Sequence, residues 1–131
     1  GVVDIYMPDM KYASDQIARY YSKVPHYPEI NQAAVREMHR QVGDLQIDET
    51  GLARRGLLVR HLVLPEGLAG TSQTAKFLAQ EVSRDTYVNV LDEYKPHHKA
   101  GLNQFYRFTG DYYISIVNTI LNWSFQSLNF C

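Results

Sequence analysis

Apolar residues fall along this chain in two kinds of pattern, and together these predict an α/β fold. Short apolar runs predict strands over residues 2–7, 57–64 and 86–91. The middle run is nearly continuous and lies between Gly56 and Pro65, which is typical of a strand covered on both faces. In the stretches between these runs, apolar residues recur at helical spacing. Strands that alternate with crossover connections of this length are expected to be parallel.

Helices are expected in three places, and a small hairpin in a fourth. Ser14 is a candidate N-cap for a short helix to Tyr21, and Thr71 is a candidate N-cap for a helix to Ser83. Between them, an amphipathic helix is expected to begin near Pro28 and to end at Gly43. The stripe expected to face the core is Ile30, Ala34, Met38 and Val42 in this helix, with Ala33 and Val35 beside it. In the last helix the stripe is Ala75, Leu78, Ala79 and Val82. Residues 44–53 alternate and then turn at 48–51, which predicts the hairpin.

The size, charge and cysteine content of the chain exclude several classes of protein. The chain has 131 residues, enough for one domain, and a net charge of -1, so no electrostatic argument favours nucleic acid or an anionic membrane as a partner. Cys131 is the single cysteine, so this chain alone forms neither a disulfide framework nor a thiolate cluster. A reducing compartment, the cytoplasm, fits this usage. No signal peptide is visible, and the chain begins in a strand-like run without methionine, so upstream sequence is expected.

The composition changes at Gly101. From there to Cys131 the charged residues are Arg107 and Asp111, whereas half of the chain's aromatic residues lie in this stretch. We therefore divide the chain into a domain of residues 1–100 and a tail of residues 101–131. The tail is either an element that covers a barrel or sequence foreign to the domain.

Charged residues lie at or just beyond the carboxyl end of every expected strand. Asp9 and Lys11 follow the first strand, Arg60 and Glu66 mark the second, and residues 92–95 follow the third. In a parallel sheet or barrel these ends converge on one face, where ligands bind. The pattern therefore predicts a common rim.

Three of these side chains allow more than one interpretation. Arg60 and His61 are neighbours in a strand and should face opposite ways. Arg60 needs an anionic partner, either within the domain or in a bound ligand. Asp9 and Lys11 should face the same way, as a solvated pair or as the groups that hold the two charges of a zwitterionic ligand. Lys11, if buried, would also suit Schiff-base chemistry.

Other motifs are weak or absent. Asp92, Glu93, His97 and His98 form a cluster of metal-binding residue types, but adjacent histidines seldom reach one ion, so no metal site is expected. The sequence has no glycine-rich dinucleotide loop, phosphate-binding loop or nucleophile elbow.

Three segments carry a resemblance to a known family. Residues 4–11 resemble the strand with the Asp-x-Lys motif in radical S-adenosylmethionine enzymes related to the pyruvate formate-lyase activating enzyme. Residues 59–65 with the glycine-rich turn after them, and residues 89–96, resemble the next two strands. Order and spacing agree over Val2 to Ala100, and the chain looks most similar to the uncharacterised branch of activating-enzyme-like proteins. After Ala100 the tail departs from the pattern.

The resemblance implies that the chain is the C-terminal half of a partial (β/α)6 TIM-like barrel with a small hairpin insertion. In the family, three cysteines of the N-terminal half hold a [4Fe-4S] cluster that cleaves S-adenosylmethionine to a 5'-deoxyadenosyl radical. Those cysteines are absent here, so this chain alone is not expected to turn over. Carried over to this sequence, Asp9, Met10 and Lys11 would contact S-adenosylmethionine, with Arg60 on the same face. Tyr94 stands where activating enzymes have a cofactor-contacting histidine.

Three functions remain open from the sequence. The first is a fragment of a radical S-adenosylmethionine enzyme that acts on a protein substrate, a glycyl-radical enzyme. The second is a Schiff-base lyase or aldolase-like barrel fragment that uses Lys11. The third is a non-catalytic interaction module that uses the aromatic tail as its contact surface.

Overall fold

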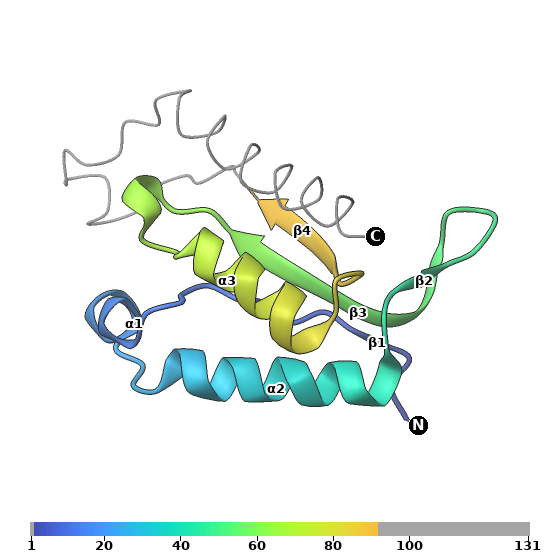
Figure 1. Ribbon diagram of the computed structural model, residues 1–131, viewed down its shortest axis with the longest axis horizontal. Coiled ribbons are helices and arrows are strands. Elements are labelled where there is room, and N and C mark those ends of the chain that lie inside the picture. The colour runs from blue at the N-terminus through green and yellow to red at the C-terminus, as the bar shows by residue number, and fades with distance from the viewer. Residues whose placement is uncertain (1, 92–131) are drawn as a thin grey trace. The chain divides into compact units, whose positions relative to one another are not determined.

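The computed structural model describes residues 2–91, which form a mixed α/β unit (Figure 1). In chain order the elements are β1 (Ile5–Tyr6), α1 (Asp15–Ser22), α2 (Tyr27–Val42), β2 (Gln46–Ile47), β3 (Ala53–Leu62), a 3-10 turn η1 (Pro65–Gly67), α3 (Thr71–Phe77), a π-helical turn η2 (Leu78–Val82) that continues α3, and β4 (Tyr87–Leu91). The expected alternation of strands and helices is confirmed.

β3 is the central strand of the sheet. β1 and β4 both pair with it in parallel, and β2 pairs with it antiparallel near its start. The register places Ile5 opposite Gly56, and the same offset holds at the isolated bridge between Asp9 and Arg60. The predicted parallel strands are therefore confirmed, although β1 is shorter than the run over residues 2–7 suggested.

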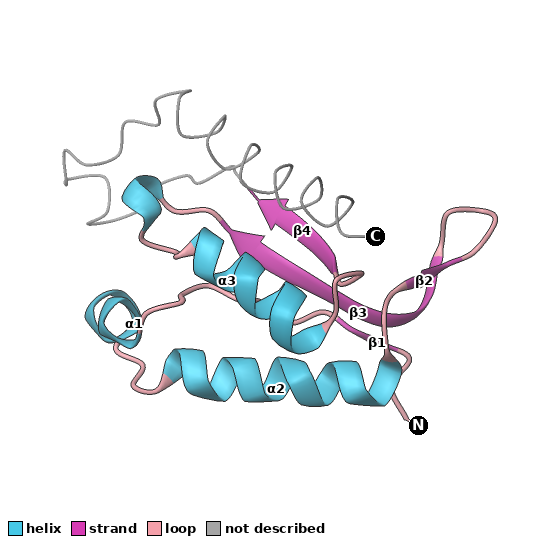
Figure 2. Cartoon of the chain, in the orientation of Figure 1, coloured by secondary structure: helices cyan, strands magenta, loops and turns pink. Residues whose placement is uncertain are grey.

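The two faces of β3 have different environments. Leu57, Val59 and His61 are buried, whereas the alternate residues Leu58, Arg60 and Leu62 are only partly buried. Figure 2 shows the helices α2 and α3 along one side of the sheet. We call the opposite surface, which no helix in the described residues covers, the open face. Arg60 and His61 thus point to opposite faces, as the alternation predicted.

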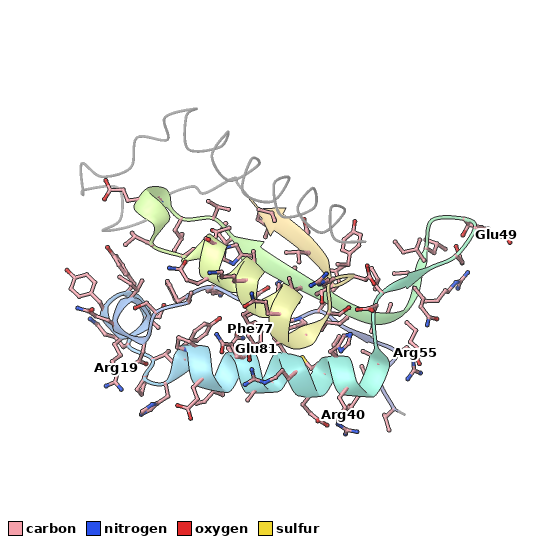
Figure 3. The ribbon with its side chains drawn as sticks, viewed as in Figure 1. Arg19, Arg40, Glu49, Arg55, Phe77 and Glu81 are labelled. Carbon is pink, nitrogen blue, oxygen red and sulfur yellow. The ribbon has the colours of Figure 1, made fainter. Side chains whose placement is uncertain are left out.

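The hydrophobic core fills the space between the sheet and the two helices. Val35 from α2, Leu57 and Val59 from β3, and Phe77 from α3 form one cluster of buried side chains. Figure 3 shows Phe77 and Glu81 between α3 and α2. An ion pair closes the exposed edge of this contact, because Nη1 of Arg36 lies 2.7 Å from Oε2 of Glu81.

Local signals explain where the helices begin and end. Ser14 accepts a hydrogen bond from the N–H of Ile17 and caps α1, as expected. Pro28 lies in the first turn of α2, where its missing N–H costs nothing. Gly43 follows Val42 with a φ of 76° and ends the helix.

The hairpin predicted over residues 44–53 is present and packs closely on β3. Gly56 has a φ of 120°, and a Cβ atom there would overlap the carbonyl group of Asp44. The N–H of Leu57 donates to the carbonyl of Gly43. Glycine at position 56 therefore lets the segment before β2 approach the central strand.

Three details of the expected helices were wrong. The stripe on α2 is confirmed at Met38 and Val42, which belong to or pack against the core, but Ile30 at its start is 63% exposed. Phe77 replaces Ala75 as a core residue of α3. Gly70, and not Thr71, occupies the N-cap of α3, because the hydroxyl of Thr71 bonds to His61 instead.

The predictions about domain organisation lie outside the described residues. They are the domain boundary at residue 100 and the nature of the tail over residues 101–131.

Candidate functional site

The loop after β1 and the carboxyl-terminal part of β3 meet at an ion pair. Nε and Nη2 of Arg60 each lie 2.7 Å from Oδ1 of Asp9. The side chains are 41% and 36% exposed, so the pair lies at the surface and adds little to stability. It leaves Oδ2 of Asp9 and Nη1 of Arg60 available, because within residues 2–91 neither of these atoms has a close hydrogen-bond partner.

Lys11 joins this pair from the same loop. Its Nζ lies 3.9 Å from Oδ2 of Asp9, and its side chain is 55% exposed. The trio of Asp9, Lys11 and Arg60 therefore sets two cationic groups around one carboxylate, with an excess of positive charge. Such a surface suits the carboxylate of a ligand, while the free oxygen of Asp9 suits an ammonium or another cation.

Hydrogen bonds from several elements fix the backbone that carries Asp9 and Lys11. The N–H of Met10 donates to the carbonyl of Arg60, and the N–H of Arg60 donates to the carbonyl of Pro8. On the side away from β3, side chains of α2 bond to the backbone of the same segment. Nδ2 of Asn31 donates to the carbonyl of Asp9 at 3.0 Å, and the N–H of Lys11 donates to the hydroxyl of Tyr27 at 3.0 Å. The segment is thus held from two sides.

The hydroxyl proton of Tyr27 makes a second hydrogen bond to this segment. Its hydroxyl donates to the carbonyl of Asp9 at 3.4 Å. Burial raises the pKa of Tyr27 above its ordinary value of 10.0, so the hydroxyl keeps its proton. The ring also packs edge-on against Tyr12, with 5.6 Å between the centroids.

His61 reaches the same segment from the core. The side chain is 1% exposed, and its Nδ1 lies 2.6 Å from the carbonyl oxygen of Met10. A carbonyl only accepts, so Nδ1 carries the proton and donates. The unprotonated Nε2 then accepts from the hydroxyl of Thr71 at 2.9 Å. Burial lowers the pKa of His61, which keeps the ring neutral.

A row of polar side chains crosses the open face of the sheet. The register places Asp9 beside Arg60 and Arg60 beside Asn89 of β4, so the three share one face. Residues with exposed or partly exposed apolar side chains occupy the same face along the strands: Ile5, Met7, Leu58, Leu62, Tyr87 and Leu91. A polar row within an apolar surface is the usual composition of a small-molecule site.

The loops that follow β1 and β3 also pack together beside the trio. The N–H of Ala13 donates to the carbonyl of Ala69 at 3.0 Å. Gly70 has a φ of 67°, and a Cβ atom there would lie 2.5 Å from Cβ of Ala13. The glycine-rich turn therefore lets the loop after β3 pack against the loop after β1.

The structure brings some of the predicted site residues together and separates others from them. Asp9, Lys11 and Arg60 lie together, as the rim hypothesis required. Met10 does not face them, since its side chain is 4% exposed within the core and its backbone groups bond to Arg60 and His61. Glu66 is exposed and makes no ion pair among the described residues. Tyr94 and residues 92–95 lie outside the part of the chain that the structure describes.

Sequence reasoning missed four residues around the site. Asn89 was identifiable, because it is the polar residue inside an apolar strand and strand alternation fixes its face. Tyr27, Asn31 and Thr71 had no such signal, since their role depends on how helices dock on the sheet.

Neither a metal site nor a membrane span occurs in the described residues. No group of three or more histidine, cysteine, aspartate or glutamate side chains in residues 2–91 is arranged to hold an ion. None of the helices described there combines the length and the apolar character that crossing a bilayer requires. The histidine pair at 97 and 98 lies outside this part of the chain.

Comparison with known proteins identifies a distant relative. No protein-family model matches the chain, and no solved structure matches it. An uncharacterised protein of Methanocaldococcus jannaschii is 29% identical to it over 101 residues, which are 76% of this chain and 25% of that protein. The chain thus spans about a quarter of the length of the curated relative it matches. The name of the relative indicates no function, so the site geometry has to carry the functional argument.

Proposed function

We propose that this chain is the C-terminal half of the partial (β/α)6 barrel of a radical S-adenosylmethionine enzyme, and that Asp9, Lys11 and Arg60 help to hold the cofactor. The observation that carries the proposal is the convergence of these side chains at the carboxyl ends of adjacent parallel strands. Ligands of parallel α/β proteins bind at that end of the sheet.

The charges of the trio fit the methionyl part of the cofactor. Arg60 and Lys11 would bind its carboxylate, and Asp9 would attract its ammonium or sulfonium charge. Asn89 extends the polar row by one strand and offers an amide to the ribose or the adenine. The apolar residues around the row would exclude water from the bound ligand.

The sheet itself fits half of a barrel. β1 pairs with β3 on one side, and within residues 2–91 no strand pairs with its other edge. The open face carries Ile5, Met7 and Leu58, which a closed barrel would place in its interior. A further half of the barrel would cover both the unpaired edge of β1 and the open face of the sheet.

The iron-sulfur cluster would have to come from elsewhere in the protein. Residues 2–91 contain no cysteine, so the described residues do not fit a cluster, and we assign none of them to it. When bound, the cluster would supply the electron that cleaves S-adenosylmethionine. The residues of this chain would bind and orient the cofactor. The resemblance to activating enzymes favours a glycyl-radical enzyme as the protein substrate and a cytoplasmic location.

Exposure of Lys11 disfavours the Schiff-base alternative. A lysine nucleophile is favoured by burial in an apolar pocket, whereas Lys11 is 55% exposed and has the carboxylate of Asp9 beside it, which stabilises the charged ammonium. Borohydride treatment with a carbonyl substrate should therefore leave Lys11 unmodified.

The test uses the complete gene product, purified and reconstituted with iron and sulfide without oxygen. With dithionite and S-adenosylmethionine it should form 5'-deoxyadenosine, and Arg60→Gln should slow this reaction. Arg36→Gln is the matched control, because Arg36 is 43% exposed and forms an ion pair away from the rim. A protein that binds no cluster and forms no 5'-deoxyadenosine would refute the proposal.

A further inference from the structure

His61 is the buried residue that connects the rim to the inside of the protein. It lies on β3 directly after Arg60, but on the opposite face. Through Nδ1 it holds the carbonyl of Met10, the residue between Asp9 and Lys11. One side chain of β3 therefore contacts the ligand site directly, while its neighbour fixes the loop that completes the site.

We infer that His61 is a positioning residue that sets the separation of Asp9, Lys11 and Arg60 through the carbonyl of Met10. The inference rests on the proposed function for the identity of the ligand. The Met10 carbonyl lies in the core, where a buried acceptor without a donor is costly. Without the imidazole proton the loop would move to find another donor, and the two charges it carries would move with it.

The contact with Thr71 fixes the ring rather than the loop. The Thr71 hydroxyl donates to Nε2, so it favours the neutral ring that is protonated on Nδ1. It also ties the ring to the first residue of α3. Loss of this hydroxyl should affect the ligand site less than loss of the Nδ1 donor, because the Met10 carbonyl remains bonded.

Two substitutions of similar size separate these contacts. The amide of His61→Asn ends where Nδ1 lies and can still donate to Met10. The amide of His61→Gln extends one bond farther, reaches the position of Nε2, and leaves the Met10 carbonyl without a donor. Thr71→Val removes the other hydrogen bond. Both His61 variants remove the ring, so loss of its packing alone does not predict that Gln is worse than Asn, and Thr71→Val keeps the ring in place.

The measurement is the affinity of the reconstituted full-length protein for S-adenosylmethionine, together with hydrogen exchange at the amides of Met10 and Lys11. His61→Gln should weaken binding by roughly tenfold and speed exchange at both amides. His61→Asn and Thr71→Val should remain within about threefold of the wild type in affinity. Equal effects of the Asn and Gln variants, or no effect of either, would overturn the inference.

Failure of the proposed function gives a different result. If the wild type binds no S-adenosylmethionine, the exchange measurement alone decides whether His61 positions the loop. If His61→Gln does not fold, nitrogen NMR of the wild-type ring decides instead. A neutral ring protonated on Nδ1 is required, and a ring protonated on Nε2 would overturn the inference.

Discussion

The guanidinium of Arg60 and the carboxylate of Asp9 lie 2.7 Å apart, although 51 positions separate the two residues in the chain. Parallel pairing of β1 and β3 brings them together, and Lys11 follows from the same loop. The pair is half-exposed and leaves hydrogen-bonding capacity on both partners. The pair is therefore a surface ion pair and not a buried structural one.

Stability should depend little on this ion pair. Arg60→Gln should lower the free energy of unfolding by at most about 1 kcal/mol, because solvent screens both groups. Arg36→Gln should cost a similar amount, since the two arginines are 41% and 43% exposed. Urea unfolding measures both variants. A loss of several kcal/mol in Arg60→Gln alone would show that the pair is structural.

Gly56 should be the least replaceable glycine of the described unit. Gly56→Ala would place a methyl group against the backbone of Asp44 at a φ of 120°, and we expect a loss of more than about 2 kcal/mol. Gly51 is the matched control, because its φ is 84° but nothing lies within 4 Å of an added Cβ. Gly51→Ala should cost only about 1 kcal/mol of conformational strain. Equal losses of unfolding free energy in urea would contradict the close packing of β3 against residue 44.

The core stripe of α2 can be tested by one pair of variants on the same helix. Val35 is fully buried, so Val35→Ala should lower the unfolding free energy by about 1.5–3 kcal/mol. Ile30 is 63% exposed, and Ile30→Ala should cost less than about 0.5 kcal/mol. Urea unfolding of the two variants measures both losses. A larger loss in Ile30→Ala than in Val35→Ala would contradict this orientation of α2.

Acid should destabilise the protein first through His61. Its pKa in the folded protein is lowered from the ordinary value of 6.5, because burial disfavours the charged ring. Below pH 6.5 the unfolded chain therefore binds a proton that the folded chain does not, and the unfolding free energy falls until the pH reaches the folded pKa. His61→Asn should flatten this part of the pH profile.

Two surface carboxylates, Glu37 and Asp48, affect the unfolding free energy in a separate and more acidic pH range. Hydrogen bonds from Arg40 lower the pKa of Glu37 to about 2, and those from Thr50, Leu52 and Arg54 do the same for Asp48. Their contribution is complete above their ordinary pKa values and is lost only as the pH falls toward 2. An unchanged profile between pH 7 and 5 in His61→Asn would therefore contradict the assignment to His61.

Local sequence signals predicted the elements well because each has a local cause. The cap at Ser14, the stop at Gly43 and the alternation along β3 depend on neighbouring residues. The strand ends that meet at the rim follow from parallel order alone. By contrast, how far the buried stripe of α2 extends depends on how the helix docks, and that is why Ile30 was wrongly placed in the core.

The sequence predicted the charged residues of the candidate site but not the hydrogen bonds that hold them in place. Asp9, Lys11 and Arg60 are visible as charges at strand ends. Met10 sits between two of them, and only the structure shows that its side chain turns into the core. The bonds from Tyr27 and Asn31 come from the first turns of α2 to the segment that follows β1, a tertiary arrangement with no sequence signature.

Calorimetric titration of S-adenosylmethionine into the reconstituted full-length protein tests the central claim most directly. Asp9→Asn and Arg60→Gln should each weaken binding by roughly tenfold or more, whereas Arg36→Gln should leave it unchanged. Wild-type affinity in all three variants, or no binding by the wild-type protein, would contradict a cofactor site at this rim.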